Sequence, residues 1–459
     1  MKYLKLIRNK EDQLIEDLIQ LLKIPSMYDE KTISKSAPFG QPIRDALDWM
    51  LNKAQQDGFK IEDVDGYAGV ISYGEGSESI SMLGHLDVVP SGLGWNSDPF
   101  EPVISDGFLF ARGAGDDKGP TIAAYHALKL IKELNIPLKR QIKLIVGTDE
   151  ERGMSCMDYF KENYSPLPTM GFVPDADFPV IYGEKGFLNL KIKGLSQTII
   201  KSMNAGERPN IVIGQASLLV DGVLKKDLFE IYCRQNNLSG TCHIKDGYAY
   251  YELEGKYFHA SLAHRGVNAA VHLLKFVGGV YEDALSTQLG NILSDPFGQG
   301  LNIYFKGSHM GELSMNAGII SINDNQVDIT LDIRYPHDSD PIKLYEQAQK
   351  VVEDLDLNLA CMICSQDDPL FVDPQSELVI KCMESYQEVT GDYQTPPLTM
   401  GGGTYARMLD NHVAFGPVLP KRPYPAYVGG PHEKNEGVEI ETLLIATAVY
   451  ASALIKLAS

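Results

Sequence analysis

Hydrophobic and polar residues recur along the chain with two different periods, and both periods predict regular structure. From Glu11 to Lys23 apolar residues return every three or four positions, which is the pattern of an amphipathic helix. A second helix is expected over Pro42–Asp57. Short apolar or alternating runs predict strands at Lys60–Val64, Gly69–Tyr73, Ile80–Leu83 and Gln141–Val146. Helices and strands thus alternate, which is typical of an α/β domain.

The pattern changes after Tyr182 and changes back near Ser376. Between these points strand-like runs such as Phe187–Lys193 and Val327–Ile333 dominate, with helical segments between them. From Ser376 the first pattern resumes, and it ends in an apolar helix over Ile440–Leu457. We therefore predict a two-domain α/β protein, with residues 1–183 and 376–459 in one domain and residues 184–375 forming an inserted α+β domain.

Composition narrows the class of protein. The 459 residues are 44% hydrophobic, enough for more than one core, and the net charge of -20 argues against nucleic-acid binding. No leader is evident at the N-terminus, and no apolar run is expected to approach the about 18 residues of a membrane span. The six cysteines are scattered and predict reduced thiols. We expect a cytoplasmic protein without a nucleic-acid or membrane partner.

A histidine and an aspartate stand at the end of one predicted strand. The apolar run Ile80–Leu83 leads into Gly84-His85-Leu86-Asp87. In an extended backbone, residues two apart point to the same side, so Asp87 could accept the second ring N–H of His85. Metal-bound imidazoles need this kind of support. Taken alone, the motif is more typical of a structural pair or a surface loop.

More acidic side chains follow at later strand ends and in a glycine-rich loop. Asp116 and Asp117 precede a predicted helix, Glu150 and Glu151 follow the strand Gln141–Val146, and Asp175 follows another apolar run. Each could be a helix cap or a solvated turn. In open α/β sheets, however, ligands collect beyond the carboxyl ends of the strands. Together with His85 and the late His432, these residues fit a hydrolytic site with two cations.

These motifs together resemble the zinc carboxypeptidase/aminoacylase metallopeptidases, and most closely the PepV-type bacterial dipeptidases. The likeness covers nearly the whole chain. It rests on motifs that read here GHLDVVP, RGAGDDKG, GTDEE, PDA, HAS, GGGTYAR and GGPHEKNE. The resemblance implies a two-domain zinc-peptidase fold, in which a central mixed sheet flanked by helices forms the catalytic domain and the inserted α+β domain is a lid.

The resemblance also implies a role for individual residues. It makes His85 and Asp175 ligands of one metal, and Glu151 and His432 ligands of the other. Asp116 would bridge both metals, because only Asp116 keeps the family's Asp-x-Lys spacing to Lys118. The Asp116–Asp117 peptide bond would be cis.

The remaining roles concern catalysis and substrate binding. Asp87 would orient His85, Glu150 would be the general base, and His259 of the inserted domain would stabilise the oxyanion. Substrate positioning is expected from Asn210, Arg334 and the backbone N–H groups of Gly401, Gly402, Gly403 and Thr404.

We therefore expect a dinuclear metallo-dipeptidase that hydrolyses small peptides with two divalent ions, Zn²⁺ first and Mn²⁺ as the alternative. The large inserted domain favours a monomer. Two other functions remain open at this point. One is an N-acyl amino acid deacylase, and the other is a non-catalytic metal-binding or peptide-binding protein on the same scaffold.

Overall fold

The computed structural model describes residues 2–420 and 422–459, which divide into two compact units. Unit 1 contains Met1–Tyr182, Val372–Leu398 and Gly403–Ser459, and unit 2 contains Gly183–Phe371 and Thr399–Gly402. The sequence assigned all of 376–459 to the catalytic domain, so Thr399–Gly402 differs from that assignment. The reason is hydrogen bonding within unit 2: the Met400 carbonyl accepts the Lys185 N–H at 2.9 Å.

A mixed sheet forms the centre of unit 1. Its strands run in the order β1 (Lys60–Val64), β2 (Ala68–Tyr73), β6 (Gln141–Gly147), β3 (Ser79–His85), β7 (Met170–Val173) and β22 (His412–Ala414), and β9 (Ile181–Glu184) pairs with β22. Strands β6, β3, β7 and β22 are parallel, while β1 and β2 are antiparallel at one edge. Every residue of β3 is buried, which explains its apolar run.

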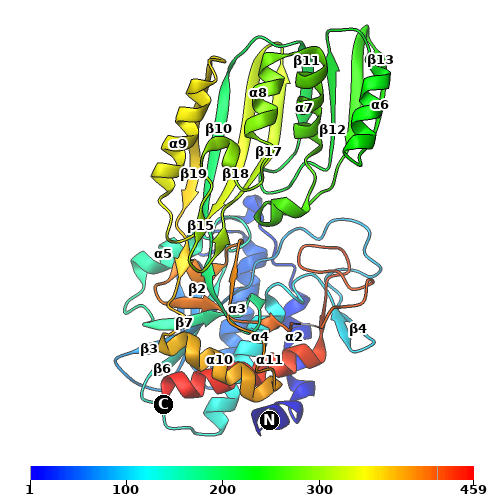
Figure 1. The fold of residues 1–459 in the computed structure, drawn as a ribbon. Coiled ribbons are helices and arrows are strands. Elements are labelled where there is room, and N and C mark those ends of the chain that lie inside the picture. Colours follow the sequence, from blue (N-terminus) through cyan, green and yellow to red (C-terminus); the bar gives the residue numbers. More distant parts are fainter. Residues whose placement is uncertain (1, 421) are drawn as a thin grey trace. The chain divides into compact units, whose positions relative to one another are not determined.

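Helices pack on this sheet. Helices α4 (Lys118–Glu133) and α11 (Ile440–Ala458) pack on strands β3 and β6 and on each other, and α3 (Gln41–Gln56) packs on β1 and β2 (Figure 1). Unit 1 also contains α1 (Lys2–Arg8), α2 (Glu11–Leu22), α5 (Ser155–Asn163), α10 (Glu377–Thr390) and the short strands β4 (Val103–Ser105), β5 (Phe108–Phe110), β8 (Ala176–Asp177), β23 (Pro417–Val418) and β24 (Gly437–Glu439). The predicted helices over residues 11–23 and 42–57 are confirmed as α2 and α3.

Helix α11 corrects the expectation that no apolar run of the chain approaches the length of a membrane span. It has 19 residues with a mean hydropathy of 1.6, so by length and composition it could cross a membrane. However, 78% of this apolar stretch is buried inside the structure, where α11 packs against α1, α4 and α10. A helix that is apolar on all sides is expected in the core of a large domain.

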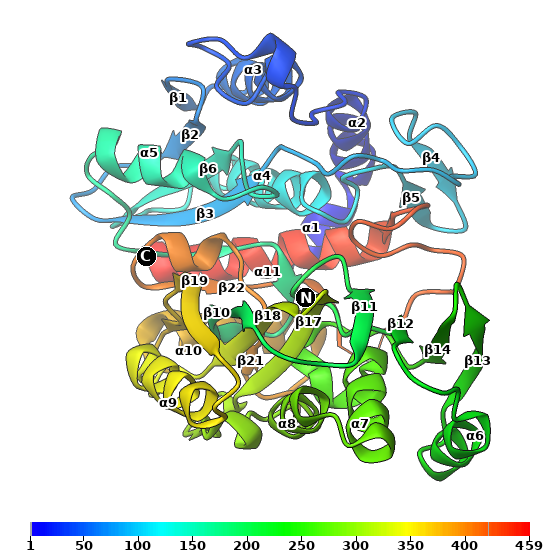
Figure 2. The same ribbon diagram turned by 90° about the horizontal axis from the view of Figure 1, so that it is seen from above.

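Unit 2 is built on an antiparallel sheet of eight strands. Their order is β13 (Ser239–Lys245), β14 (Tyr248–Glu254), β12 (Gln215–Val220), β11 (Ile200–Ala205), β17 (Ser314–Asn323), β18 (Gln326–Tyr335), β10 (Gly186–Leu195) and β19 (Leu359–Asp367). One face carries α6 (Lys226–Gln235), α7 (Ala269–Tyr281), α8 (Ala284–Ile292) and α9 (Pro341–Asp354), as Figures 1 and 2 show. Side chains of β10 alternate between buried and half-buried, as expected for a sheet with one covered face.

Candidate metal centre

The fold brings the predicted ligands of unit 1 to one edge of its sheet. His85 is the last residue of β3, Glu150 and Glu151 follow β6, and Asp175 follows β7. Strand β3 lies between β6 and β7 and is parallel to both. The carboxyl ends of the three strands therefore meet, and the side chains that follow them converge.

Two groups of metal-binding side chains form there, and both include Asp116. In the first group the Nε2 atom of His85 lies 3.0 Å from Asp116 Oδ1 and 3.7 Å from Asp175 Oδ2. In the second group the Nε2 atom of His432 lies 3.2 Å from Asp116 Oδ2 and 2.9 Å from Glu151 Oε2. The potential ligand atoms within each group lie within 4.8 Å of one another. The two oxygens of Asp116 thus face different groups, as a bridging carboxylate requires.

The chemistry of these side chains suits divalent cations of the transition series, which accept both imidazole and carboxylate ligands. Hydrogen bonds from the His432 ring to Asp116 and Glu151 raise the pKa of His432 to about 10, although burial acts in the opposite direction. Burial lowers the pKa of His85, but hydrogen bonds to Asp116, Asp175 and Asp87 outweigh it and raise that pKa well above its usual value. The carboxylates therefore create a potential that attracts positive charge.

Glu150 lies beside these groups but belongs to neither of them. Burial raises the pKa of Glu150 well above its usual value, and the carboxylates of Asp175, Asp116 and Glu151 act in the same direction. A carboxyl group with a raised pKa beside a cation site is suited to accepting and returning a proton.

Asp87 lies beside His85 and also holds the two glutamates that follow β6. The nearest acceptor to His85 Nδ1 is the backbone carbonyl of Asp87, at 3.0 Å, while the Asp87 carboxylate is 3.5 Å away. The carboxylate also accepts the backbone N–H groups of Glu150 and Glu151, each at 3.1 Å. Asp87 thus faces the His85 ring with both its backbone carbonyl and its carboxylate, and its role in orienting His85 stays a prediction.

Two further carboxylates hold ligand residues by their backbone, and the sequence prediction missed both. Asp117 accepts the His85 N–H at 3.1 Å and the Thr121 hydroxyl at 2.9 Å. Glu436 accepts the Asp116 N–H at 3.1 Å. Both residues lie in motifs that carry the family resemblance, which is the only signal that could have identified them. The Asp116–Asp117 peptide bond is cis, which confirms that expectation.

In unit 2, His259 lies next to the segment that contains Asn210. The Ala260 N–H donates to the Asn210 carbonyl at 2.9 Å. The Nδ1 atom of His259 accepts the Ser261 N–H at 3.3 Å and lies 2.8 Å from the Ser261 hydroxyl. Partial burial and then the charge of Arg334 lower the pKa of His259. A neutral ring whose Nδ1 accepts a hydrogen bond carries its proton on Nε2, so His259 presents a neutral N–H donor.

Arg334 and Gly401 also come together in unit 2. The Arg334 guanidinium binds the Asp332 carboxylate through two nitrogens, at 2.5 and 2.8 Å, and donates to the Gly401 carbonyl at 3.2 Å. A side chain at Gly401 would collide with Ser261, because its Cβ would lie 2.4 Å from the Ser261 Cβ. Gly402 belongs to the same unit, whereas Gly403 and Thr404 belong to unit 1, where the Thr404 hydroxyl accepts the Ala406 N–H.

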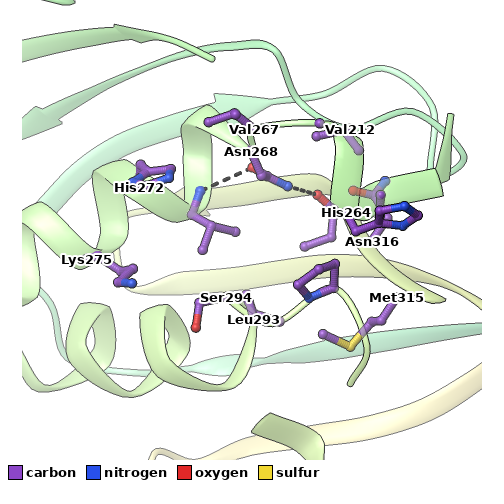
Figure 3. A pocket seen from close by; sticks show the side chains of 15 residues that line it. Val212, His264, Val267, Asn268, His272, Lys275, Leu293, Ser294, Met315 and Asn316 are labelled. Carbon is purple, nitrogen blue, oxygen red and sulfur yellow. Dashed lines mark hydrogen bonds between the residues drawn. The ribbon is translucent and has the colours of Figure 1, made fainter. Parts of the chain in front are cut away.

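Unit 2 also contains a cavity of about 270 Å³ beside the start of α7 (Figure 3). Asn268 caps α7 by accepting the Val271 N–H and donates to the Ala317 carbonyl. Asn316 donates to the carbonyls of Pro209 and Ile211, on either side of the predicted substrate residue Asn210. Among the described residues that line the cavity there is no carboxylate and no predicted site residue. None of the predicted metal-binding, catalytic or substrate-binding residues therefore lines this cavity.

Comparisons with known proteins agree with a metallopeptidase site of this kind. The chain is 35% identical over 471 residues to the Bacillus subtilis (strain 168) protein named "Putative dipeptidase YtjP", covering 99% of both chains. It is 36% identical over 474 residues to "Putative dipeptidase SAB1611c" of Staphylococcus aureus (strain bovine RF122 / ET3-1), covering 98% of both.

Solved structures share the fold at lower identity. Human carnosine dipeptidase 1 matches with a TM-score of 0.58 and 15% identity, over 99% of this chain and 98% of that one. Aminoacylhistidine dipeptidase from Vibrio alginolyticus matches with a TM-score of 0.58 and 16% identity, over 97% and 96%. The family model for peptidase family M20/M25/M40 matches residues 82–456. The predicted metallopeptidase membership is thereby confirmed, and the chain belongs to peptidase family M20/M25/M40.

Proposed function

We propose that this protein is a dipeptidase of the PepV type, which hydrolyses dipeptides with a free carboxylate at a centre of two divalent cations. The observation that carries the proposal is the position of Asp116, whose two oxygens face two separate groups of ligands. Family membership and the dipeptidase names of relatives with the same length support the reaction class.

The first cation would be held by His85, Asp116 and Asp175, and the second by Asp116, Glu151 and His432. When bound, the cations supply Lewis acidity, which polarises the scissile carbonyl and makes a water easier to deprotonate. Glu150 would accept the proton of the attacking water and later deliver it to the leaving amine. Asp87 would orient His85 and would hold Glu150 in place by accepting its backbone N–H.

His259 would donate its Nε2–H to the developing oxyanion. The hydrogen bonds from Ser261 to Nδ1 support this role, because they fix the tautomer that carries the proton on Nε2. Asn210, Arg334, Gly401, Gly402, Gly403 and Thr404 would position the substrate. Of these, Arg334 acts through the Gly401 carbonyl that it holds.

We further propose Zn²⁺ as the cation, with Mn²⁺ as the alternative, since imidazole and carboxylate ligands accept both. The protein would act as a monomer on small peptides in the cytoplasm, without a nucleic-acid or membrane partner. The six free cysteines of the structure are consistent with a reducing compartment, and the net charge of -20 disfavours nucleic acid.

The test is hydrolysis of a panel of dipeptides and of the corresponding N-acetyl amino acids, with Zn²⁺ or Mn²⁺ and after chelation. We expect metal-dependent turnover of the dipeptides and little turnover of the acetylated compounds. Preference for the acetylated compounds would identify a deacylase instead. Metal binding without turnover of either class would identify a non-catalytic binding protein.

A further inference from the structure

A fully buried carboxylate lies directly behind the proposed bridging residue. Glu436 is 1% exposed. Its Oε1 atom accepts the N–H groups of Gly115 at 2.8 Å and Asp116 at 3.1 Å, and its Oε2 atom accepts the Gly113 N–H at 3.2 Å. Both oxygens are therefore engaged by the loop that presents Asp116.

Arg112 is the partner of this carboxylate. Its Nη1 atom donates to Glu436 Oε2 at 2.5 Å. Its Nη2 atom donates to the backbone carbonyls of Ser91 and His432, each at 3.3 Å. The guanidinium also lies over the ring of Trp95, 5.2 Å from its centroid. The pair thus joins the loop that presents Asp116 to the loop that presents His432, although the two loops are far apart in the sequence.

A buried ion pair of this kind is expected to contribute little to the free energy of unfolding. Removing two charges from water is costly, and replacing a buried ion pair with apolar side chains is often neutral for stability or even favourable. What the pair provides is orientation, because the planar guanidinium fork and the two carboxylate oxygens fix the relative position of the backbone groups that they bind.

The two proposed cation positions differ in how their histidines are held. His85 ends a fully buried strand, and its backbone N–H is fixed by Asp117. The His432 side chain is 54% exposed, and its backbone adopts a φ of 65° in a loop. The second cation position therefore depends more than the first on contacts such as the hydrogen bond from Arg112 to the His432 carbonyl.

We propose that Arg112 and Glu436 form a positioning pair that sets the affinity of the second cation, the one held by Asp116, Glu151 and His432. The inference rests on the proposed dinuclear centre. Neither residue would touch a cation or the substrate. Both would act through the backbone of residues that do, and such supporting contacts typically account for a factor of 10–100 in metal affinity.

The test is a titration of the metal-free protein with Co²⁺, followed by the visible absorption of the bound ion. Arg112→Lys keeps the charge but cannot donate to Glu436, Ser91 and His432 together. Glu436→Gln keeps the volume but replaces one acceptor oxygen with an NH2 donor, which would face either the donors of Arg112 and Gly113 or those of Gly115 and Asp116. For both variants we expect the first Co²⁺ to bind with less than a threefold change and the second roughly 10–100-fold more weakly.

Asp17→Asn is the matched control. Asp17 is a buried carboxylate of the same unit that pairs with His126 and contacts none of the proposed ligands. This variant should lower the unfolding temperature but leave both Co²⁺ affinities unchanged. The control therefore separates a general loss of stability from a change at the cation positions.

Each outcome has a defined meaning. If the wild-type protein binds two ions and Arg112→Lys binds both with wild-type affinity, the positioning role is overturned and the dinuclear centre stands. Equal weakening of both ions would overturn the assignment to the second position. If the wild-type protein binds fewer than two ions, the proposed function fails together with the inference. Should Glu436→Gln fail to fold, Arg112→Lys decides alone.

Discussion

Three buried carboxylates in unit 1 accept the backbone N–H groups of proposed ligands without being ligands themselves. Asp117 binds His85, Glu436 binds Asp116, and Asp87 binds Glu151. A carboxylate that accepts backbone N–H groups forms strong, charge-assisted hydrogen bonds. At the scale of single residues, the site therefore uses acidic side chains in two ways, to face the cations and to fix the loops that present the ligands.

Glu150→Gln tests the role of the proposed base. The amide cannot accept a proton from water, so kcat should fall by roughly 10²–10⁴-fold, while both cations remain bound. Glu151→Gln is the matching variant and should lose one cation, because Glu151 belongs to a ligand group. Steady-state kinetics combined with metal analysis would measure both effects. Loss of a cation in Glu150→Gln would mean that the two glutamates have exchanged roles.

His259→Ala tests the proposed oxyanion donor. We expect kcat to fall by roughly 10²–10³-fold, which is the usual effect of removing one such donor, with little change in KM or metal content. His264→Ala is the control, because His264 is an exposed histidine of the short helical segment Ala260–Arg265, which His259 caps. Near-wild-type kcat in His259→Ala would remove His259 from the mechanism.

At the scale of helices and strands, the sequence predicted the elements whose apolar residues recur with a regular period. Helices α2 and α3 and strands β1, β3 and β6 follow from the spacing of apolar residues, and the acids at strand ends follow from the order of the elements. Contacts between distant segments leave no periodic signal. The pairing of Arg112 with Glu436 and the hydrogen bonds that Asp87 makes could be found only once the fold was known.

Strand β22 contains a buried histidine whose protonation should affect stability. His412 is fully buried, with Nε2 2.6 Å from the Ser81 hydroxyl and Nδ1 2.8 Å from the Asp410 carbonyl. Burial lowers the pKa of His412 from 6.5 to about 4. Between these values the unfolded chain binds the proton more tightly than the folded one, so stability falls as the pH drops from about 6.5 to about 4.

His412→Gln should remove this dependence. Between pH 7.5 and pH 5 the histidine should contribute about 2 kcal/mol to the loss of unfolding free energy in the wild-type protein. Urea unfolding of both proteins at the two pH values would measure the difference. The variant starts from a lower stability because its side chain fits the site less well, so the comparison concerns only the change with pH. An equal change in both proteins would contradict the assignment to His412.

At the scale of the whole molecule, unit 1 is assembled from both ends of the chain, and each unit has an extensive apolar core of its own. The proposed cation centre lies at one edge of the sheet of unit 1, on the end of β3 and on loops, and its ligands are polar side chains. In small metal-dependent domains the metal replaces a missing core, and the domain unfolds without it. We expect this protein to belong to the opposite class, because each of its units buries an apolar core of its own.

Removal of the cations should therefore abolish hydrolysis and leave the fold intact. We expect no measurable turnover after chelation, an almost unchanged far-ultraviolet circular dichroism spectrum, and full recovery when Zn²⁺ or Mn²⁺ is returned. The unfolding temperature should still fall, because a ligand present at about 1,000 times its Kd stabilises the folded state by about 4 kcal/mol. In the metal-free protein the carboxylates of Glu150, Glu151 and Asp175 also lose their counter-charge. A collapse of the circular dichroism signal would mean that the cations hold unit 1 together, and full turnover after verified metal loss would contradict the metal-dependent mechanism itself.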